Sequence, residues 1–189
     1  MHALPPYEEL LSEVLITEEQ LKKRIAELGA QISKDYAGEE LLMICLLRGA
    51  VLFLTDLMRQ ISIPHTIDFM AVSSYGVGAR ESSGMVRITM DIRTNIQNRN
   101  VLIVEDIIDS GQTLSSVMEL LEARHPKTLR ACTLLDKTER REVDVPIHYV
   151  GFDIKDKFVF GYGLDLDEYY RDLPFIGVVD LDKYTPPDE

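Results

Sequence analysis

The chain has 189 residues, of which 46% are hydrophobic, and its formal net charge is −12. This length predicts a single domain, over residues 1–189, that is large enough to bury a core. The acidic balance disfavours a nucleic-acid partner, which requires a basic face. No apolar stretch has the length needed to span a bilayer, and residues 1–10 lack the basic region and apolar run of a secretory signal. We therefore expect a cytoplasmic protein that binds neither nucleic acid nor membrane.

Alternating helices and strands are expected along most of the chain. Thr17 and Gln20 have the spacing of a capping box, and the apolar residues that follow recur at helical intervals, which predicts a helix over about residues 18–36. Strands are expected at residues 41–47, 67–72, 86–90, 100–104 and 129–135, and further helices at about 50–60 and 113–123. This alternation predicts an α/β fold with a doubly wound, mainly parallel sheet flanked by helices.

Two segments lack a regular period. Residues 73–83 combine Ser, Gly, Tyr and Arg and are expected to form a loop. After Val145 the chain consists of short apolar runs interrupted by Asp, Gly and Pro. Cys45 and Cys132 each lie inside an apolar run, as expected for buried free thiols in a reducing compartment. The four histidines are too scattered to suggest a zinc site.

The most informative segment is VLIVEDIIDSGQTL, residues 101–114. Its first four residues are apolar and predict a buried strand of a parallel sheet, which Glu105 and Asp106 then end. Asp109 and Gly111 follow, before a helical pattern begins. In an open α/β sheet, ligands bind at the loops that leave the carboxyl ends of the strands, so this loop is the first candidate for a binding site.

This loop combines two kinds of chemistry. A tight turn at Gly111 would direct backbone N–H groups and the hydroxyls of Ser110 and Thr113 toward the N-terminus of a helix, which favours a phosphate. Glu105 and Asp106 would repel a phosphate, but they accept hydrogen bonds from a diol such as ribose and can approach a divalent cation. We therefore expect a sugar monophosphate as the ligand. The patterns of a Walker loop and of the dinucleotide fingerprint are both absent.

The segment resembles the phosphoribosyl pyrophosphate motif of type I phosphoribosyltransferases: an apolar strand, an acidic pair, two apolar residues and Asp-Ser/Thr-Gly-x-Thr. Five further segments occur in the order seen in hypoxanthine-guanine phosphoribosyltransferases, and the version here is similar to the bacterial members. They are LLRG (46–49), DFMAVSSYG (68–76), LLDK (134–137), DKFVFGYGLD (156–165) and EYYRDLP (168–174). The resemblance covers about residues 41–179. It implies a core of about residues 37–145 and a small hood subdomain, made from the N-terminal segment and about residues 146–189.

The activity that the resemblance implies is purine salvage. Enzymes of this family transfer the 5-phosphoribosyl group from phosphoribosyl pyrophosphate to N9 of hypoxanthine or guanine, and they release IMP or GMP together with pyrophosphate. They use Mg²⁺ and usually form homodimers or homotetramers. A divalent cation also suits an acidic protein that binds a polyphosphate, because it offsets the charge repulsion.

Asp109 is the best candidate for a catalytic residue. In the family, the matching aspartate faces N7 of the purine and acts as the proton acceptor. A carboxylate beside the ring stabilises the developing positive charge and takes a proton. The alternative is a helix N-cap, a position that Asp also favours, although this would leave the acidic pair unexplained.

The resemblance assigns the other candidate residues to three parts of the substrates and to the metal. The ribose 5-phosphate is assigned to Glu105, Asp106, Ser110, Gly111, Gln112 and Thr113. Pyrophosphate is assigned to Arg48, Gly49, Ser74, Tyr75 and Arg171, and the peptide bond before the residue matching Arg48 is often cis. The purine is assigned to Lys137, Lys157, Phe158, Val159 and Asp165. Mg²⁺ is assigned to Glu105, Asp106 and Asp165.

Each assignment has an ordinary alternative. Without the resemblance, Arg48, Lys137 and Arg171 are exposed charges, and Phe158 among apolar neighbours is a core residue. Two other classes of protein stay open as well. One is a regulator on the same fold that senses phosphoribosyl pyrophosphate or nucleotide and binds nucleic acid. The other is an acidic-pocket α/β protein such as a phosphoryl-transfer receiver or a phosphatase.

Overall fold

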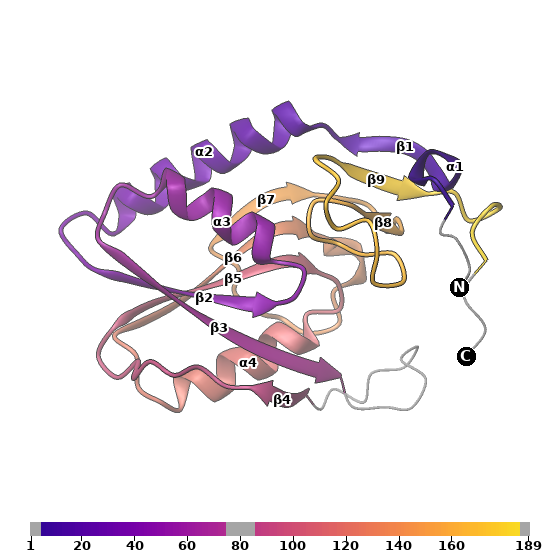
Figure 1. Cartoon of the computed structure of the whole chain (residues 1–189). Helices are drawn as coiled ribbons and strands as arrows, with labels where there is room; N and C mark the ends of the chain where they lie inside the picture. The colour runs from indigo at the N-terminus through magenta and orange to yellow at the C-terminus, as the bar shows by residue number, and fades with distance from the viewer. Residues whose placement is uncertain (1–4, 75–85, 186–189) are drawn as a thin grey trace.

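A computed structural model describes residues 5–74 and 86–185. In these residues, six strands form the larger of two sheets, in the order β4-β3-β2-β5-β6-β7 (Figure 1). They are β2 (Leu41–Leu47), β3 (His65–Ser74), β4 (Val86–Met90), β5 (Asn100–Ile108), β6 (Thr128–Asp136) and β7 (Tyr149–Asp153). All neighbouring pairs are parallel except β3 and β4. The predicted mainly parallel sheet is therefore confirmed.

Helices cover both faces of this sheet. Figure 1 shows α2 (Glu18–Asp35) and α3 (Val51–Gln60) on one face and α4 (Gln112–Glu122) on the other. The capping box at the start of α2 is present: the Thr17 N–H donates to Gln20 Oε1 at 2.8 Å, and the Gln20 N–H donates to Thr17 Oγ1 at 3.3 Å. Helices on both faces confirm the doubly wound arrangement.

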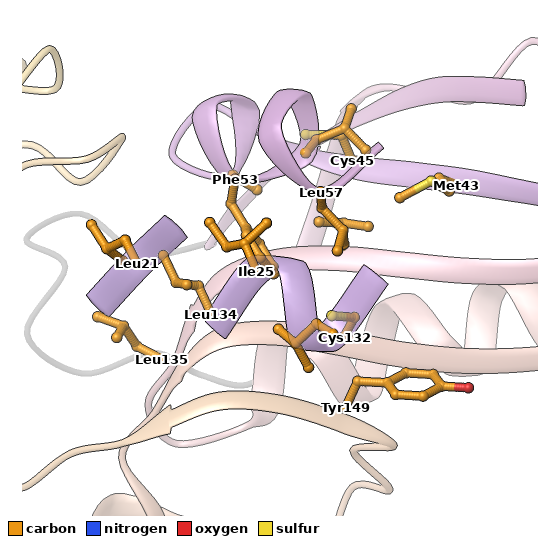
Figure 2. Close-up of a cluster of buried hydrophobic side chains, with 14 of the residues drawn as sticks. Leu21, Ile25, Met43, Cys45, Phe53, Leu57, Cys132, Leu134, Leu135 and Tyr149 are labelled. Carbon is orange, nitrogen blue, oxygen red and sulfur yellow. The ribbon is translucent and has the colours of Figure 1, made fainter. Parts of the chain in front are cut away.

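The central strands are apolar on both sides because they are covered on both sides. Met43 and Cys45 of β2 pack into the cluster beneath α2 and α3, which Figure 2 shows in close-up. Leu42 and Ile44 of the same strand pack into the cluster beneath α4. Successive side chains of a strand point to opposite faces, so one uninterrupted apolar run serves both clusters.

A second sheet joins the two ends of the chain. It consists of β1 (Leu11–Ile16), β9 (Ile176–Val179) and β8 (Val159–Phe160), and all its pairs are antiparallel. The short helix α1 (Tyr7–Leu10) leads into it. A separate apolar cluster lies here, around the fully buried ring of Phe160. We call this part of the molecule, residues 5–16 and 154–185, the hood.

Two parts of the larger sheet differ from the sequence-based expectation. The strand expected to end at Val104 continues to Ile108, because β6 stays beside it and keeps pairing through Asp136. The acidic pair therefore lies within β5 and does not end it. The resemblance places the stretch after about residue 145 in the hood; within it, Tyr149–Asp153 forms β7, the edge strand of the larger sheet that pairs with β6. Backbone pairing with a neighbouring strand is non-local, so the local pattern does not reveal it.

Both cysteines are buried and free, as expected. Burial raises the pKa of the Cys45 thiol to about 12 and that of Cys132 higher still. Each thiol therefore behaves as a small apolar side chain of the core. Among the helices of residues 5–74 and 86–185, none is both long and apolar enough to cross a membrane.

Candidate active site

Three loops meet where β2, β5 and β6 end. The connection through α3 leads from β2 to β3, and the connection through α4 leads from β5 to β6, so neighbouring strands β2 and β5 send their helices to opposite faces. Such a switch point is where open α/β sheets bind ligands. We call residues 47–50, 105–113 and 136–141 the site edge. A pocket of about 130 Å³ opens there, lined by residues 105, 107–111, 113 and 114.

The loop between β5 and α4 forms a cradle around Gly111. This residue is the N-cap of α4 and has a φ of +85°, in the left-handed region that favours glycine. A Cβ atom at Gly111 would lie 2.9 Å from Arg141 Nη1, so the end of the arginine side chain would have to move. Ser110 Oγ accepts a bond of 3.4 Å from the Gln112 N–H. The first N–H groups of α4 thus face the loop, an arrangement that attracts anions.

Asp109 is not the N-cap of α4, because Gly111 holds that position. Its carboxylate instead makes ion pairs with Arg140 Nε, at 2.7 Å, and with Lys137 Nζ, at 3.7 Å. Both cations also reach Asp156, at 3.1 Å and 3.3 Å. Lys137 is buried, with its side chain 8% exposed, and so is not the solvated charge of the ordinary interpretation. The structure therefore brings together the predicted catalytic aspartate and the predicted purine-binding lysine.

The acidic pair occupies the floor of the site. Asp106 Oδ1 accepts a bond of 2.9 Å from the Ile107 N–H, and a Cβ atom at Gly49 would lie only 1.6 Å from Asp106 Oδ2. Burial raises the pKa of both carboxyl groups, and the neighbouring Asp106 charge helps to raise the pKa of Glu105 well above its ordinary value. Glu105 Oε2 is buried without a hydrogen-bond partner in the described part of the chain. Unpaired carboxylate oxygens of this kind fit a divalent cation with hard oxygen ligands.

Two of the pyrophosphate candidates, Arg48 and Arg171, belong to an ion-pair cluster between the site edge and the hood. The peptide bond from Leu47 to Arg48 is cis. Arg48 pairs with Glu168 at 2.9 Å, and Arg171 pairs with Glu168 at 3.2 Å and with Asp165 at 2.9 Å. Asp165 is thus held by an arginine. Within residues 5–74 and 86–185, no three Asp, Glu, His or Cys side chains lie close enough together to hold a metal, so Asp165 does not join the acidic pair.

The hood supplies the other predicted purine-binding residues. Phe158 is 44% exposed and meets the Tyr184 ring edge-on, with centroids 5.9 Å apart, so it is not a core residue. Val159 is buried in β8, where its strand pairs with β9. The Lys157 ammonium group forms an ion pair with Glu13. An exposed aromatic ring beside a buried backbone segment leaves a flat surface for a base.

Two pyrophosphate candidates and two residues that were not predicted remain to be described. Ser74 is the last residue of β3, and Tyr75 lies outside the described residues. Sequence reasoning missed Arg140, which contacts Asp109, and Glu168, which contacts both arginines. A charged residue in a loop has no local pattern that would distinguish it, so only the folded contacts reveal these two.

Comparison with known proteins identifies the family. The model of the phosphoribosyl transferase domain matches residues 14–168, and the chain belongs to this family. A hypoxanthine phosphoribosyltransferase of Salmonella typhimurium is 53% identical over 171 residues, which cover 89% of this chain and 96% of that protein. A hypoxanthine-guanine phosphoribosyltransferase of Mycobacterium tuberculosis is 54% identical over 180 residues, covering 92% and 89%.

Solved structures agree with this identification. The crystal structure of a hypoxanthine phosphoribosyltransferase from Staphylococcus aureus superposes with a TM-score of 0.91 at 45% identity, covering 98% of this chain and 100% of the other. The resemblance inferred from the motifs, to bacterial hypoxanthine-guanine phosphoribosyltransferases with the type I fold, is therefore confirmed.

Proposed function

We propose that the protein is a Mg²⁺-dependent 6-oxopurine phosphoribosyltransferase of purine salvage. It transfers the 5-phosphoribosyl group of phosphoribosyl pyrophosphate to N9 of hypoxanthine or guanine, giving IMP or GMP and pyrophosphate. The observation that carries the proposal is that one loop holds both Asp109 and the glycine-centred anion cradle at the N-terminus of α4. The acidic chain works in the cytoplasm as a homodimer or homotetramer, as expected for the family.

The chain's own residues would hold phosphoribosyl pyrophosphate in two places. The 5′-phosphate binds to the N–H groups and hydroxyls of residues 110–113, and the ribose hydroxyls bind to Glu105 and Asp106. Arg48, Gly49 and Arg171 take the pyrophosphate, with Ser74 and Tyr75 assigned to the same group. A planar guanidinium suits phosphate oxygens because it donates two parallel hydrogen bonds.

The same acidic pair is suited to the metal. Mg²⁺ held by Glu105 and Asp106 together with substrate oxygens would supply positive charge that offsets the charge of the leaving group. Asp165, paired here with Arg171 at 2.9 Å, would need to exchange that partner to join them.

Asp109 would manage the proton of the base. N9 of the purine forms a bond to the anomeric carbon, the bond from that carbon to pyrophosphate breaks, and pyrophosphate leaves with the electron pair. The proton on N7 passes to Asp109, which restores the neutral ring. Lys137 donates to O6, while Phe158 and Lys157 flank the base and the Val159 backbone meets its edge. The buried position of Lys137, 3.7 Å from Asp109, supports a shared contact with one ring.

Two rivals have less support. A nucleic-acid-binding regulator would require a basic face, against a net charge of −12, and the relatives that match this chain are named as enzymes. A phosphoryl-transfer receiver or phosphatase would need the acidic pocket but not the anion cradle beside it.

An assay with separate bases tests the proposal. Purified protein is incubated with Mg²⁺, phosphoribosyl pyrophosphate and one of hypoxanthine, guanine, xanthine, adenine or uracil, and the nucleotides are separated by chromatography. IMP or GMP is the expected product, and chelation of the metal should abolish it. A folded protein that makes no nucleotide from any base but binds IMP would instead favour the regulator.

A further inference from the structure

Glu168 accepts hydrogen bonds from two arginines that come from different parts of the chain. Arg48 donates from Nη1 to Glu168 Oε2 at 2.9 Å and from Nη2 to Oε1 at 3.3 Å. Arg171 donates from Nη2 to the same Oε2 at 3.2 Å. One carboxylate thus bridges the loop after β2 and the hood.

This carboxylate is not needed to hold the fold together. The side chains of Arg48 and Glu168 are 71% and 58% exposed. Ion pairs exposed to this degree contribute little to the free energy of unfolding. The tight contact between the hood and the site edge comes instead from the backbone, because a Cβ atom at Gly163 would lie 2.1 Å from the Gly49 carbonyl oxygen.

The turn keeps Glu168 beside the arginines independently of those ion pairs. Its backbone has a φ of +71°, and its N–H donates to Asp165 Oδ2 at 2.9 Å. Leu166 and Tyr169, on either side, exchange two backbone hydrogen bonds of 3.1 Å. The left-handed conformation is uncommon for a residue with a side chain and persists where surrounding contacts fix it.

The donors that Glu168 occupies are those that a diphosphate would use. Carboxylates and phosphates bind the guanidinium group in the same bidentate geometry, so they compete for it. Arg171 carries a second carboxylate partner, Asp165. Two arginine charges are therefore matched by two carboxylate charges at the place where the proposed function puts pyrophosphate.

We propose that Glu168 is an internal competitor of pyrophosphate for Arg48 and Arg171. It lowers the affinity of the site for this anion and thereby favours release of the product. The competition costs little in either direction, since the displaced carboxylate is exposed and regains water. This inference rests on the proposed function, which assigns pyrophosphate to these arginines.

Two neighbouring single-charge substitutions test the inference. Glu168→Gln removes the charge that faces both arginines. Asp167→Asn removes the same charge one residue earlier, where the φ is also left-handed, at +53°, and where the carboxylate accepts from the Tyr184 hydroxyl at 2.8 Å. Isothermal titration calorimetry measures the dissociation constant of pyrophosphate for each protein at one fixed Mg²⁺ concentration. Initial rates give the inhibition constant of pyrophosphate and the KM of phosphoribosyl pyrophosphate.

The expected result is that Glu168→Gln binds pyrophosphate about 3- to 10-fold more tightly, a gain of up to about 1.4 kcal/mol. The KM of phosphoribosyl pyrophosphate should fall with it, and the gain should shrink as salt is added. Asp167→Asn should stay within about twofold of the unmodified protein, a change of less than about 0.5 kcal/mol. An unchanged or weaker affinity in Glu168→Gln would overturn the inference, as would an equal gain in Asp167→Asn. If the unmodified protein makes IMP but Glu168→Gln gains no affinity for pyrophosphate, only the competitor role is wrong. If the unmodified protein neither binds pyrophosphate nor makes nucleotide, the proposed function is wrong as well.

Discussion

The site edge and the hood face one another across the candidate active site, but different interactions build them. The site edge continues from β2, β5 and β6, whose central residues are fully buried between helices on both faces. The hood joins segments far apart in the sequence, since Leu11 of β1 pairs with Val179 of β9, 168 residues later. It also keeps several large apolar side chains exposed, at 44–66%: Val14, Phe158, Tyr169 and Leu181.

This difference matches the work that each region would do. A residue that must meet a reacting atom needs a rigid base, and the burial of β5 supplies one for Asp109. A cover that admits and releases substrates must open at lower cost. Exposed polar contacts, such as that of the Tyr170 hydroxyl with the Pro5 carbonyl at 2.6 Å, are typical of regions that open locally. Substitutions in the two regions should therefore affect different measurements.

The largest effect is expected at the site edge. Asp109→Asn should lower kcat for IMP formation by about 10²- to 10⁴-fold, because an amide cannot take the N7 proton. The affinity for IMP should change far less. Asp156→Asn is the matched control, since Asp156 shares Arg140 and Lys137 as partners but comes from the hood. If both substitutions reduce kcat equally, the ion-pair network and not proton transfer is responsible.

Substitution of two phenylalanines in the hood should distinguish an effect on stability from an effect on purine binding. Phe160 is fully buried, whereas Phe158, two residues earlier, is 44% exposed. Phe160→Ala should lower the free energy of unfolding by about 3–5 kcal/mol, because it leaves a cavity in the hood cluster. Phe158→Ala should lower it much less and should instead raise the KM of the purine. Denaturant unfolding and initial rates on both variants check this. A purine KM that is insensitive to Phe158→Ala would remove this ring from the base site.

The same division explains which features the sequence reveals. The helix α2 and strands β2 and β4 agree closely with their predicted bounds, because a capping box, an apolar run or an alternating apolar pattern marks each one locally. The hood strands β1 and β9 are not predicted from the sequence, since each is stabilised by a partner at the other end of the chain. The sequence does not reveal Arg140 and Glu168 for a related reason. Their contacts with Asp109 and Arg48 depend on how loops from different strands converge.

A single methyl group added at Gly163 should disrupt the close contact between the hood and the site edge. Gly163 has a φ of +96°, and a Cβ atom there would lie 2.1 Å from the Gly49 carbonyl oxygen. Gly163→Ala should lower the free energy of unfolding by about 1–3 kcal/mol through overpacking, in addition to the cost of the left-handed backbone. Gly38→Ala isolates that second cost, since Gly38 has a φ of +82° but nothing within 4 Å of the added atom.

Thermal unfolding compares the stability of the two glycine variants, and the KM of phosphoribosyl pyrophosphate is the second quantity to measure. Only Gly163→Ala should raise this KM, because it moves the hood away from Gly49 at the pyrophosphate site. Equal losses of stability and an unchanged KM in both variants would mean that the hood adjusts freely over the site edge.

The smallest effect is expected at Glu105, and it should depend on pH. Burial and the Asp106 charge raise the pKa of the Glu105 carboxyl in the folded protein well above the unfolded value of about 4.3. The folded state thus favours the protonated form, so this group's contribution to stability is full below about pH 4.3 and is lost as the pH rises through the raised pKa. Glu105→Gln lacks this loss. The variant should therefore exceed the unmodified protein in stability at neutral pH, and the difference should shrink as the pH falls toward 4.3.

Urea unfolding at several pH values between about 4.5 and 8 measures this difference. Substrate affinity should change in the opposite direction to stability. The amide is a poorer partner for ribose hydroxyls and for a divalent cation, so the KM of phosphoribosyl pyrophosphate should rise. A gain in stability with a loss of substrate affinity would identify Glu105 as a group kept for function at the expense of the fold. A stability difference that stays constant across the pH range would contradict the raised pKa. In that case the acidic pair would have a structural role, like the rest of β5.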